Sequence, residues 1–334
     1  NRNNDRRAPT RGEALPAPSA KAYKLAVPKG REEELKRQVQ SHLNKIAPDN
    51  LDTISKRIKE TQVASSEELE VVIGLIMKKA LTEPHYCETY ADLVYLLQGE
   101  MPEFPSPDGG KPISFKRTLL TVCEAEFEGI AMQTIHVTDE EKEGLDKEEL
   151  DFLMSKKKGR CLATMKFIGH LFLRGLLRAS IICGVIRDLA MCTEVDQLPA
   201  EHKIECICEL LNSIGYTLES DTKGGGKEAI TQVCGRLQDL KQRKDSNKKY
   251  IYPMRLQFKI DDLIDTRKAG WLKKVFKATA KTKEEIAADA KRDERQQKND
   301  GAELVVAGQK PSYLAHGPKL DDGTWQSVPS KPRR

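Results

Sequence analysis

The sequence has few aromatic residues, no long apolar run and no Cys-x-x-Cys pair. Phenylalanine, tyrosine and tryptophan make up 5% of the 334 residues, which leaves little surface for stacking nucleic-acid bases. No segment approaches the ~18 uncharged apolar residues that a membrane span needs, so we expect no membrane association. None of the eight cysteines belongs to a Cys-x-x-Cys pair, and most lie in apolar windows. This favours reduced cysteines in a core, in a cytosolic or nuclear protein.

Proline is scarce in the middle of the chain and concentrated at its ends. Of the 16 prolines, four lie in 1–31 and four in 311–334. The ends are also basic, with net charges of +6 for 1–31 and +5 for 272–334, which leaves −6 for the rest. Polar, proline-rich ends have little apolar surface to bury. We therefore predict three segments: a disordered basic arm over 1–30, a body over 31–270, and a charged fraying helix with a disordered tail over 271–334.

The body shows the periodicity of amphipathic helices and no alternating run of strand type. Apolar residues recur at the i, i+3, i+4, i+7 spacing of a helix face in three windows. The side chains predicted to be buried in these windows include Ile73, Met77, Phe167, Phe172 and Leu211. Helix start signals and breakers divide the body into ten predicted helices, at about 31–47, 50–62, 66–81, 86–98, 113–131, 146–174, 178–192, 199–214, 226–245 and 254–267.

These ten helices make five pairs of about 48 residues each, close to the 40–47-residue period of helical-pair solenoids. A single helical pair cannot bury its apolar stripe alone, so such pairs stack into a curved array. We therefore predict an all-α fold, a HEAT-like α-solenoid of about five antiparallel helical pairs. Proteins of this architecture usually bind partners rather than catalyse reactions.

No motif of catalysis or cofactor binding is present. The stretch from Gly224 to Lys227 resembles a phosphate loop, but it lacks the upstream glycine, and Glu228 stands where a magnesium-binding Ser or Thr would be. The six histidines are scattered without metal-ligand spacing, and His170 beside the Phe167–Phe172 face is expected to be a helix-surface or a satisfied half-buried histidine rather than a ligand. We therefore expect no enzyme activity, no metal and no cofactor.

An acidic run is followed directly by a basic one. Residues 139–151 carry eight carboxylates against two lysines, and four cations come next: Lys156, Lys157, Lys158 and Arg160. One interpretation is a solvated loop that leads into an amphipathic helix. The other is a basic ridge that binds RNA phosphates without sequence preference, with the acidic loop as an intramolecular competitor. The residues alone do not decide between these two interpretations.

Several blocks occur in the order found in one family. They are EELKRQVQSHLNKIAPDNLDTISKRI, LEVVIGLIMKKALTEPHYCETYADLVYLL, ISFKRTLLTVCEAEFE, MKFIGHLFLRGLL, IECICELLNSIGYTLE and RLQFKIDDLIDTRKAGW. Together they resemble the middle domain of eukaryotic translation initiation factor 4 gamma, the scaffold of the cap-binding complex. The resemblance covers about 31–271, and two flanking segments extend it: Lys21-Ala22-Tyr23-Lys24 is similar to the family's Lys-Ala-Trp-Lys, and DDGTWQSVPSKPRR to the segment that follows the domain.

The resemblance implies a cytoplasmic scaffold that binds the DEAD-box helicase initiation factor 4A, RNA and, in some members, initiation factor 3. It places one helicase contact at the amino-terminal end, on Tyr23, Leu43, Asn44, Lys45, Ile46 and Pro48. It places the second on the last helical pair, at Arg255, Phe258, Asp262 and Asp265. For Leu43, Ile46 and Phe258, packing between helices is an equally good interpretation.

Three departures from the family pattern limit what the resemblance implies. Leu162-Ala163-Thr164 stands where the family often has Leu-Gly-Asn, which puts a contact by that segment, and factor 3 binding, in question. Tyr23 is a smaller anchor than the usual Trp. No Tyr-x4-Leu-apolar motif follows Tyr23, so a site for the cap-binding protein is not located in this chain. The alternative function is that of a sibling domain in RNA surveillance, nuclear cap binding or poly(A)-protein regulation.

Overall fold

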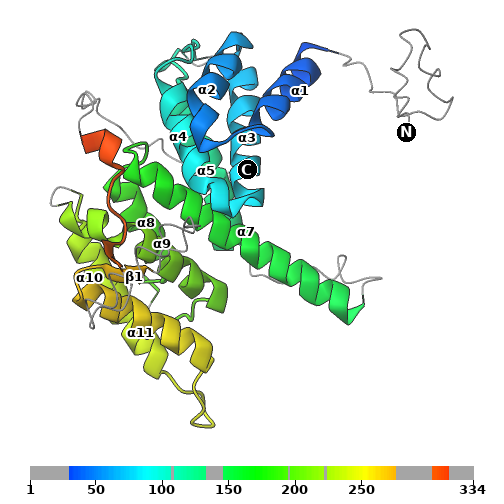
Figure 1. The fold of residues 1–334 in the computed structure, drawn as a ribbon. Helices are drawn as coiled ribbons and strands as arrows, with labels where there is room; N and C mark the ends of the chain where they lie inside the picture. Colours follow the sequence, from blue (N-terminus) through cyan, green and yellow to red (C-terminus); the bar gives the residue numbers. More distant parts are fainter. Residues whose placement is uncertain are drawn as a thin grey trace, which may run out of the picture.

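Helices make up nearly all the regular structure in the computed structural model, which describes residues 30–106, 109–132, 146–194, 196–221, 224–275 and 303–315. Within these ranges lie ten α-helices (Figure 1): α1 (Arg31–Leu43), α2 (Leu51–Glu60), α3 (Ser66–Thr82), α4 (Cys87–Gln98), α5 (Phe115–Met132), α7 (Lys147–Leu173), α8 (Ala179–Leu189), α9 (Glu201–Ser220), α10 (Gly226–Gln242) and α11 (Met254–Lys268). None of the helices in these ranges combines the length and apolarity needed to cross a membrane.

Neighbouring helices pair and the pairs stack, as a HEAT-like solenoid requires. The first pair is α1–α2, and α3–α4, α5–α7, α8–α9 and α10–α11 follow it along the chain. Each pair packs on the next, with α1 on α3, α4 on α7, α7 on α9 and α9 on α11. Figure 1 shows α1 and α2 at one end of the stack and α11 at the other. The predicted all-α solenoid is therefore confirmed.

Local signals explain where most helices begin. Ser65 caps α3 by accepting a hydrogen bond from the Glu68 amide at 3.2 Å. Asp146 and Glu149 form a reciprocal capping box at the start of α7, so the end of the acidic run serves helix initiation. Short 3-10 turns that begin with a proline, Pro48–Asn50 and Pro84–Tyr86, precede α2 and α4. Proline suits this position because its missing N–H would have no intrahelical partner.

Two helix ends differ by more than three residues from their predicted positions. α1 ends at Leu43 rather than 47, because the chain turns through Asn44–Ala47 into the 3-10 turn. α9 continues to Ser220 rather than ending near 214. Its last turn is fixed by distant partners, since Glu219 accepts hydrogen bonds at 2.7 Å from both Arg267 and the Trp271 indole. Contacts of this kind carry no local sequence signal.

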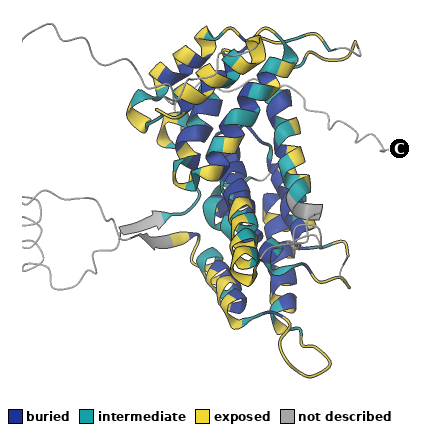
Figure 2. Cartoon of the chain, turned by 90° about the vertical axis from the view of Figure 1, so that its right-hand side faces the viewer, coloured by how far each residue is buried: buried dark blue, intermediate teal, exposed yellow. Residues whose placement is uncertain are grey.

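The core follows the predicted helix faces (Figure 2). The predicted core residues Ile73, Met77, Phe167, Phe172 and Leu211 are all buried. Seven of the eight cysteines are buried and Cys192 is half-buried, and none is in a disulfide. The predicted place of the cysteines in the core is therefore confirmed for these seven. The largest fully buried side chain is Arg174, which is charged.

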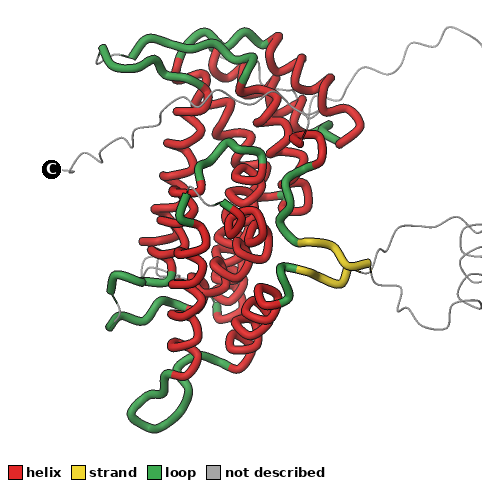
Figure 3. The backbone as a smooth tube through the Cα atoms, turned by 90° about the vertical axis from the view of Figure 1, so that its left-hand side faces the viewer, coloured by secondary structure: helices red, strands yellow, loops and turns green. Residues whose placement is uncertain are grey.

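The described parts of the segment after α11, residues 271–275 and 303–315, form a strand pair and contacts with the body rather than a helix or a disordered tail. Strand β1 (Leu272–Val275) pairs antiparallel with β2 (Glu303–Val306), and Figure 3 shows this pair leaving the side of the helical stack. The Gly308 carbonyl then accepts a 2.6 Å hydrogen bond from Thr217 of α9, and Tyr313 in the 3-10 turn Ser312–Ala315 reaches Asp92 of α4. The predicted arm over 1–30 and the charged stretch around 281–300 lie outside the described residues, Gly30 excepted.

Candidate functional site

The amino-terminal candidate surface is a rigid turn at the end of α1. Asn44, Lys45 and Pro48 are exposed and Ile46 is half-buried, as a contact surface requires. Leu43 is 1% exposed and belongs to the core, so helix packing is the interpretation that holds for it. Tyr23 lies outside the described residues.

Asn50 holds this turn in place, and the sequence reasoning missed it. Its side-chain carbonyl accepts from the Ala47 amide and its amide donates to the Lys45 carbonyl, both at 2.8 Å. The signal was available in Pro-Asp-Asn, because asparagine side chains readily bond nearby backbone in turns.

The carboxy-terminal candidate surface is one exposed stripe of α11. Arg255, Phe258, Asp262 and Asp265 are all exposed and recur at i, i+3, i+7 and i+10, which places them on one side of the helix. Phe258 is 59% exposed, which is unusual for so large an apolar side chain. For this residue core packing within the chain therefore does not hold, and the contact interpretation stays a prediction.

Further apolar side chains, which the sequence analysis did not single out, enlarge this surface. Exposed Met254 lies one turn before Phe258. The loop before α11 adds exposed Tyr250 and Ile251, and the loop before α9 adds exposed Leu198. Buried Tyr252 brings these segments together, since its hydroxyl donates to the Pro199 carbonyl at 2.7 Å. Burial raises the pKa of Tyr252 to about 12, so this hydroxyl stays a donor at neutral pH. The surface combines an apolar centre with charged neighbours, the composition of a protein-binding patch.

The four cations of the predicted RNA ridge point in different directions around α7. Lys156 is exposed and Lys157 is half-buried. Lys158 forms a 2.6 Å ion pair with Glu205 of α9. Arg160 donates to both carboxylate oxygens of Glu126 on α5, at 2.7 and 2.9 Å. Part of the predicted positive charge is therefore used inside the fold. The neighbouring Leu162-Ala163-Thr164 segment lies in the middle of α7, with Ala163 and Thr164 buried.

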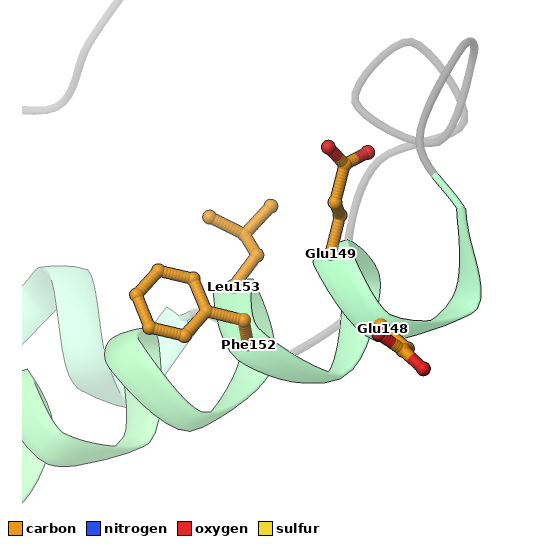
Figure 4. Close-up of a pocket in the computed structure, with 4 residues that line it drawn as sticks. All are labelled: Glu148, Glu149, Phe152 and Leu153. Carbon is orange, nitrogen blue, oxygen red and sulfur yellow. The ribbon is translucent and has the colours of Figure 1, made fainter.

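The first turns of α7 extend beyond the packed helices and carry a shallow hollow (Figures 1 and 4). Glu148, Glu149, Phe152 and Leu153 line it, and Phe152 is exposed. All four come from one short stretch of a single helix, and no other element contributes to the lining among the described residues.

Features that resembled catalytic or metal-binding elements have structural roles. Among the described residues, no group of three or more His, Cys, Asp and Glu side chains could hold a metal ion. Gly225 begins α10 with a left-handed φ of 71°, and a Cβ on Gly226 would lie 1.9 Å from the Leu218 carbonyl, so this glycine run serves helix packing. Burial and the nearby Arg174 lower the pKa of His170 to about 4, so its imidazole is neutral at neutral pH. Its buried Nδ1 has no hydrogen-bond partner among the described residues, so the expectation of a satisfied histidine is wrong for this atom.

Comparison with known proteins assigns the family. The model of the MIF4G domain matches residues 36–269, which is most of the chain. The chain belongs to the MIF4G domain family. Its relatives include the eukaryotic translation initiation factor 4G of Cucumis melo, 30% identical over 93% of the chain, and that of Arabidopsis thaliana, 29% identical over 83%. Eukaryotic translation initiation factor 4 gamma 1 of Mus musculus is 27% identical over 89%.

The MIF4G chain is much shorter than these relatives. It spans 16%, 15% and 19% of their lengths, in the order given. Among solved structures, the MIF4G domain of the Trypanosoma cruzi translation initiation factor EIF4G5 is 22% identical, with a TM-score of 0.42, and the match covers 71% of this chain and 97% of that one.

Proposed function

We propose that this MIF4G domain is a cytoplasmic scaffold of translation initiation that binds and stimulates the DEAD-box helicase initiation factor 4A. It acts by binding rather than by catalysis. Its family and the initiation factors to which it is similar support the role in initiation. Initiation factor 3 is a further candidate partner, and the cap-binding protein would join through a site outside this chain.

The exposed stripe on α11 is the observation that carries the proposal. Phe258 and Met254 are 59% and 55% exposed and lie outside the buried core. Large side chains of this kind, next to an arginine, are typical anchors at protein interfaces. The stripe therefore has the composition of a partner's docking surface.

The amino-terminal turn would supply the second contact. The Asn44–Pro48 turn and the α11 stripe lie toward opposite ends of the helical stack (Figure 1). Stacked helical pairs fix the distance between such ends. If each end of the stack bound one lobe of a two-lobed helicase, the scaffold would hold the two lobes close together. Once one lobe is bound, the contact with the other lobe forms intramolecularly, which raises avidity. Holding the lobes together is expected to speed ATP turnover, because the ATP site forms where they meet.

RNA would lie along the basic segment of α7, where Lys156 and Arg160 are the exposed cations among the four. Phosphate contacts of this kind carry no sequence preference.

The test of the helicase proposal is Phe258→Ala, assayed with purified factor 4A. Truncating an interface anchor costs ~2 kcal/mol, so we expect binding to weaken about 30-fold. Because the clamp needs both ends, ATPase stimulation at saturating scaffold should also be lost. Tyr216→Ala is the matched control, since Tyr216 is an exposed aromatic of α9 outside the surface. It should leave both quantities unchanged.

Full stimulation by Phe258→Ala at saturation would show that the carboxy-terminal contact supplies affinity alone, and the clamp would be wrong. If the wild-type chain neither binds nor stimulates the helicase, the sibling roles in RNA surveillance, nuclear cap binding or poly(A)-protein regulation become the better explanation.

A further inference from the structure

Glu205 of α9 is a buried carboxylate surrounded by cations from two other helices. Its side chain is 0% exposed, and it lies 2.6 Å from the ammonium of Lys158, 3.2 Å from the guanidinium of Arg255 and 3.9 Å from the ammonium of Lys259. Neither carboxylate oxygen accepts a well-directed hydrogen bond from the described residues. A buried, uncompensated carboxylate is strongly unfavourable. The three cations therefore compensate the charge of Glu205.

These contacts connect the basic segment of α7 with the exposed stripe of α11. Lys158 belongs to the basic segment of α7, whereas Arg255 and Lys259 lie one turn apart on α11, beside Phe258. Arg255 has a second partner in Glu201, at 2.6 Å and one turn before Glu205 on α9. Two carboxylates of one helix thus hold an arginine that is itself 58% exposed.

A long, exposed side chain normally has many rotamers, and ordering it at an interface is unfavourable. Arg255 and Lys259 are already oriented by Glu205 in the free chain. The same carboxylate draws Lys158 toward α9 and away from solvent, where a phosphate would have to compete for it.

We propose that Glu205 is a positioning residue, whose buried carboxylate fixes Arg255 and Lys259 for the helicase and keeps Lys158 from RNA. This inference rests on the proposed function. It predicts that replacing Glu205 weakens helicase binding and strengthens RNA binding. A general loss of structure would weaken both.

The test measures two affinities of the Glu205→Gln chain: for purified factor 4A, and for a labelled single-stranded oligonucleotide of RNA over a range of salt concentrations. We expect helicase binding to weaken about tenfold, equivalent to about 1.4 kcal/mol. RNA binding should strengthen at low salt, and its log–log salt slope should steepen by about 0.7, because Lys158 becomes available to one more phosphate. Glu205→Asp, which keeps the charge, should return both affinities toward wild type.

Glu219→Gln is the matched control. Glu219 also links α9 to α11, through Arg267 at 2.7 Å, but it touches neither Arg255 nor Lys158. It should change neither affinity. The double variant Glu205→Gln/Lys158→Met removes one negative and one positive charge. It replaces Glu205→Gln in both affinity measurements if Glu205→Gln alone does not fold. It should bind the helicase weakly while keeping the wild-type salt slope.

Equal weakening of both affinities in a folded Glu205→Gln chain, or helicase binding within twofold of wild type, would overturn the positioning role alone. An effect of Glu219→Gln as large as that of Glu205→Gln would do the same. Absence of helicase binding by the wild-type chain would instead overturn the proposed function, and the positioning role with it.

Discussion

Replacing Arg174 by methionine should destabilise the fold more than most single substitutions, because it breaks a buried ion pair between two helical pairs. The Arg174 side chain is 0% exposed and follows directly after α7. Its Nε donates to the Asp92 carboxylate of α4 at 2.6 Å, and an Nη donates to the His170 carbonyl at 3.2 Å. Methionine fills a similar apolar volume but leaves Asp92 without its cation.

The structure sets the expected size of the effect. Breaking a buried pair by removing one partner costs ~3–5 kcal/mol, since the other charge remains uncompensated. Asp92 keeps 20% exposure and therefore some hydration, which favours the lower end of that range. We expect a loss of about 3 kcal/mol, which for a domain of this size lowers the melting temperature by roughly 6–12 °C.

Urea denaturation followed by circular dichroism measures this loss directly. Arg160→Met is the control, because Arg160 also pairs with a carboxylate on another helix, Glu126, but is 56% exposed. Exposed pairs contribute about 0–1 kcal/mol. The double variant Asp92→Asn/Arg174→Met should recover part of the loss by removing the stranded charge. If Arg174→Met is no more destabilising than Arg160→Met, burial does not decide the strength of this pair and the reasoning fails.

Two further predictions concern acid stability and the carboxy-terminal segment. Burial keeps the pKa of His170 at about 4, below its ordinary ~6.5, so between these pH values the unfolded chain binds a proton that the folded chain does not, and stability falls as pH is lowered through this window. His170→Gln should reduce that slope in denaturation measured from pH 7 to 4, and an unchanged slope would contradict it. Gly308 has a φ of 80°, and a Cβ there would lie 2.7 Å from the Ser213 carbonyl oxygen and the Ile214 Cα. Gly308→Ala should therefore release 303–315 from α9 with little change in the melting of the body. The measurement is hydrogen exchange at the Ala307 amide, which donates to the Trp271 carbonyl and should exchange faster in the variant. Unchanged exchange would refute this prediction.

The sequence predicted the helices and the core because both depend on local spacing. A helix turns every 3.6 residues, so apolar side chains at that spacing must share one face, and a face of that kind has to be covered. Ile73, Phe167 and Leu211 could therefore be placed in the core without knowing their neighbours. The same argument separated the helices, because their caps and breakers act within a few residues.

Periodicity alone could not tell a covered face from an exposed one at the ends of the stack. Leu43 and Phe258 both lie at apolar positions of helical segments, yet Leu43 is buried in the core while Phe258 is 59% exposed. Which face remains exposed depends on how the stack ends, a property of the assembled pairs.

Only the tertiary structure decided which charges are available to partners and where the chain after α11 lies. Lys158 and Glu205 are far apart in the sequence, and their pairing depends on α7 packing against α9. Trp271 and Gly308 fit against α9 only because Gly215 there has no Cβ to meet the indole ring and Gly308 has none to meet the α9 backbone. Side-chain charges and apolar surface are fixed by sequence. Whether they face a partner or another part of the same chain depends on contacts between distant segments, which no local pattern encodes.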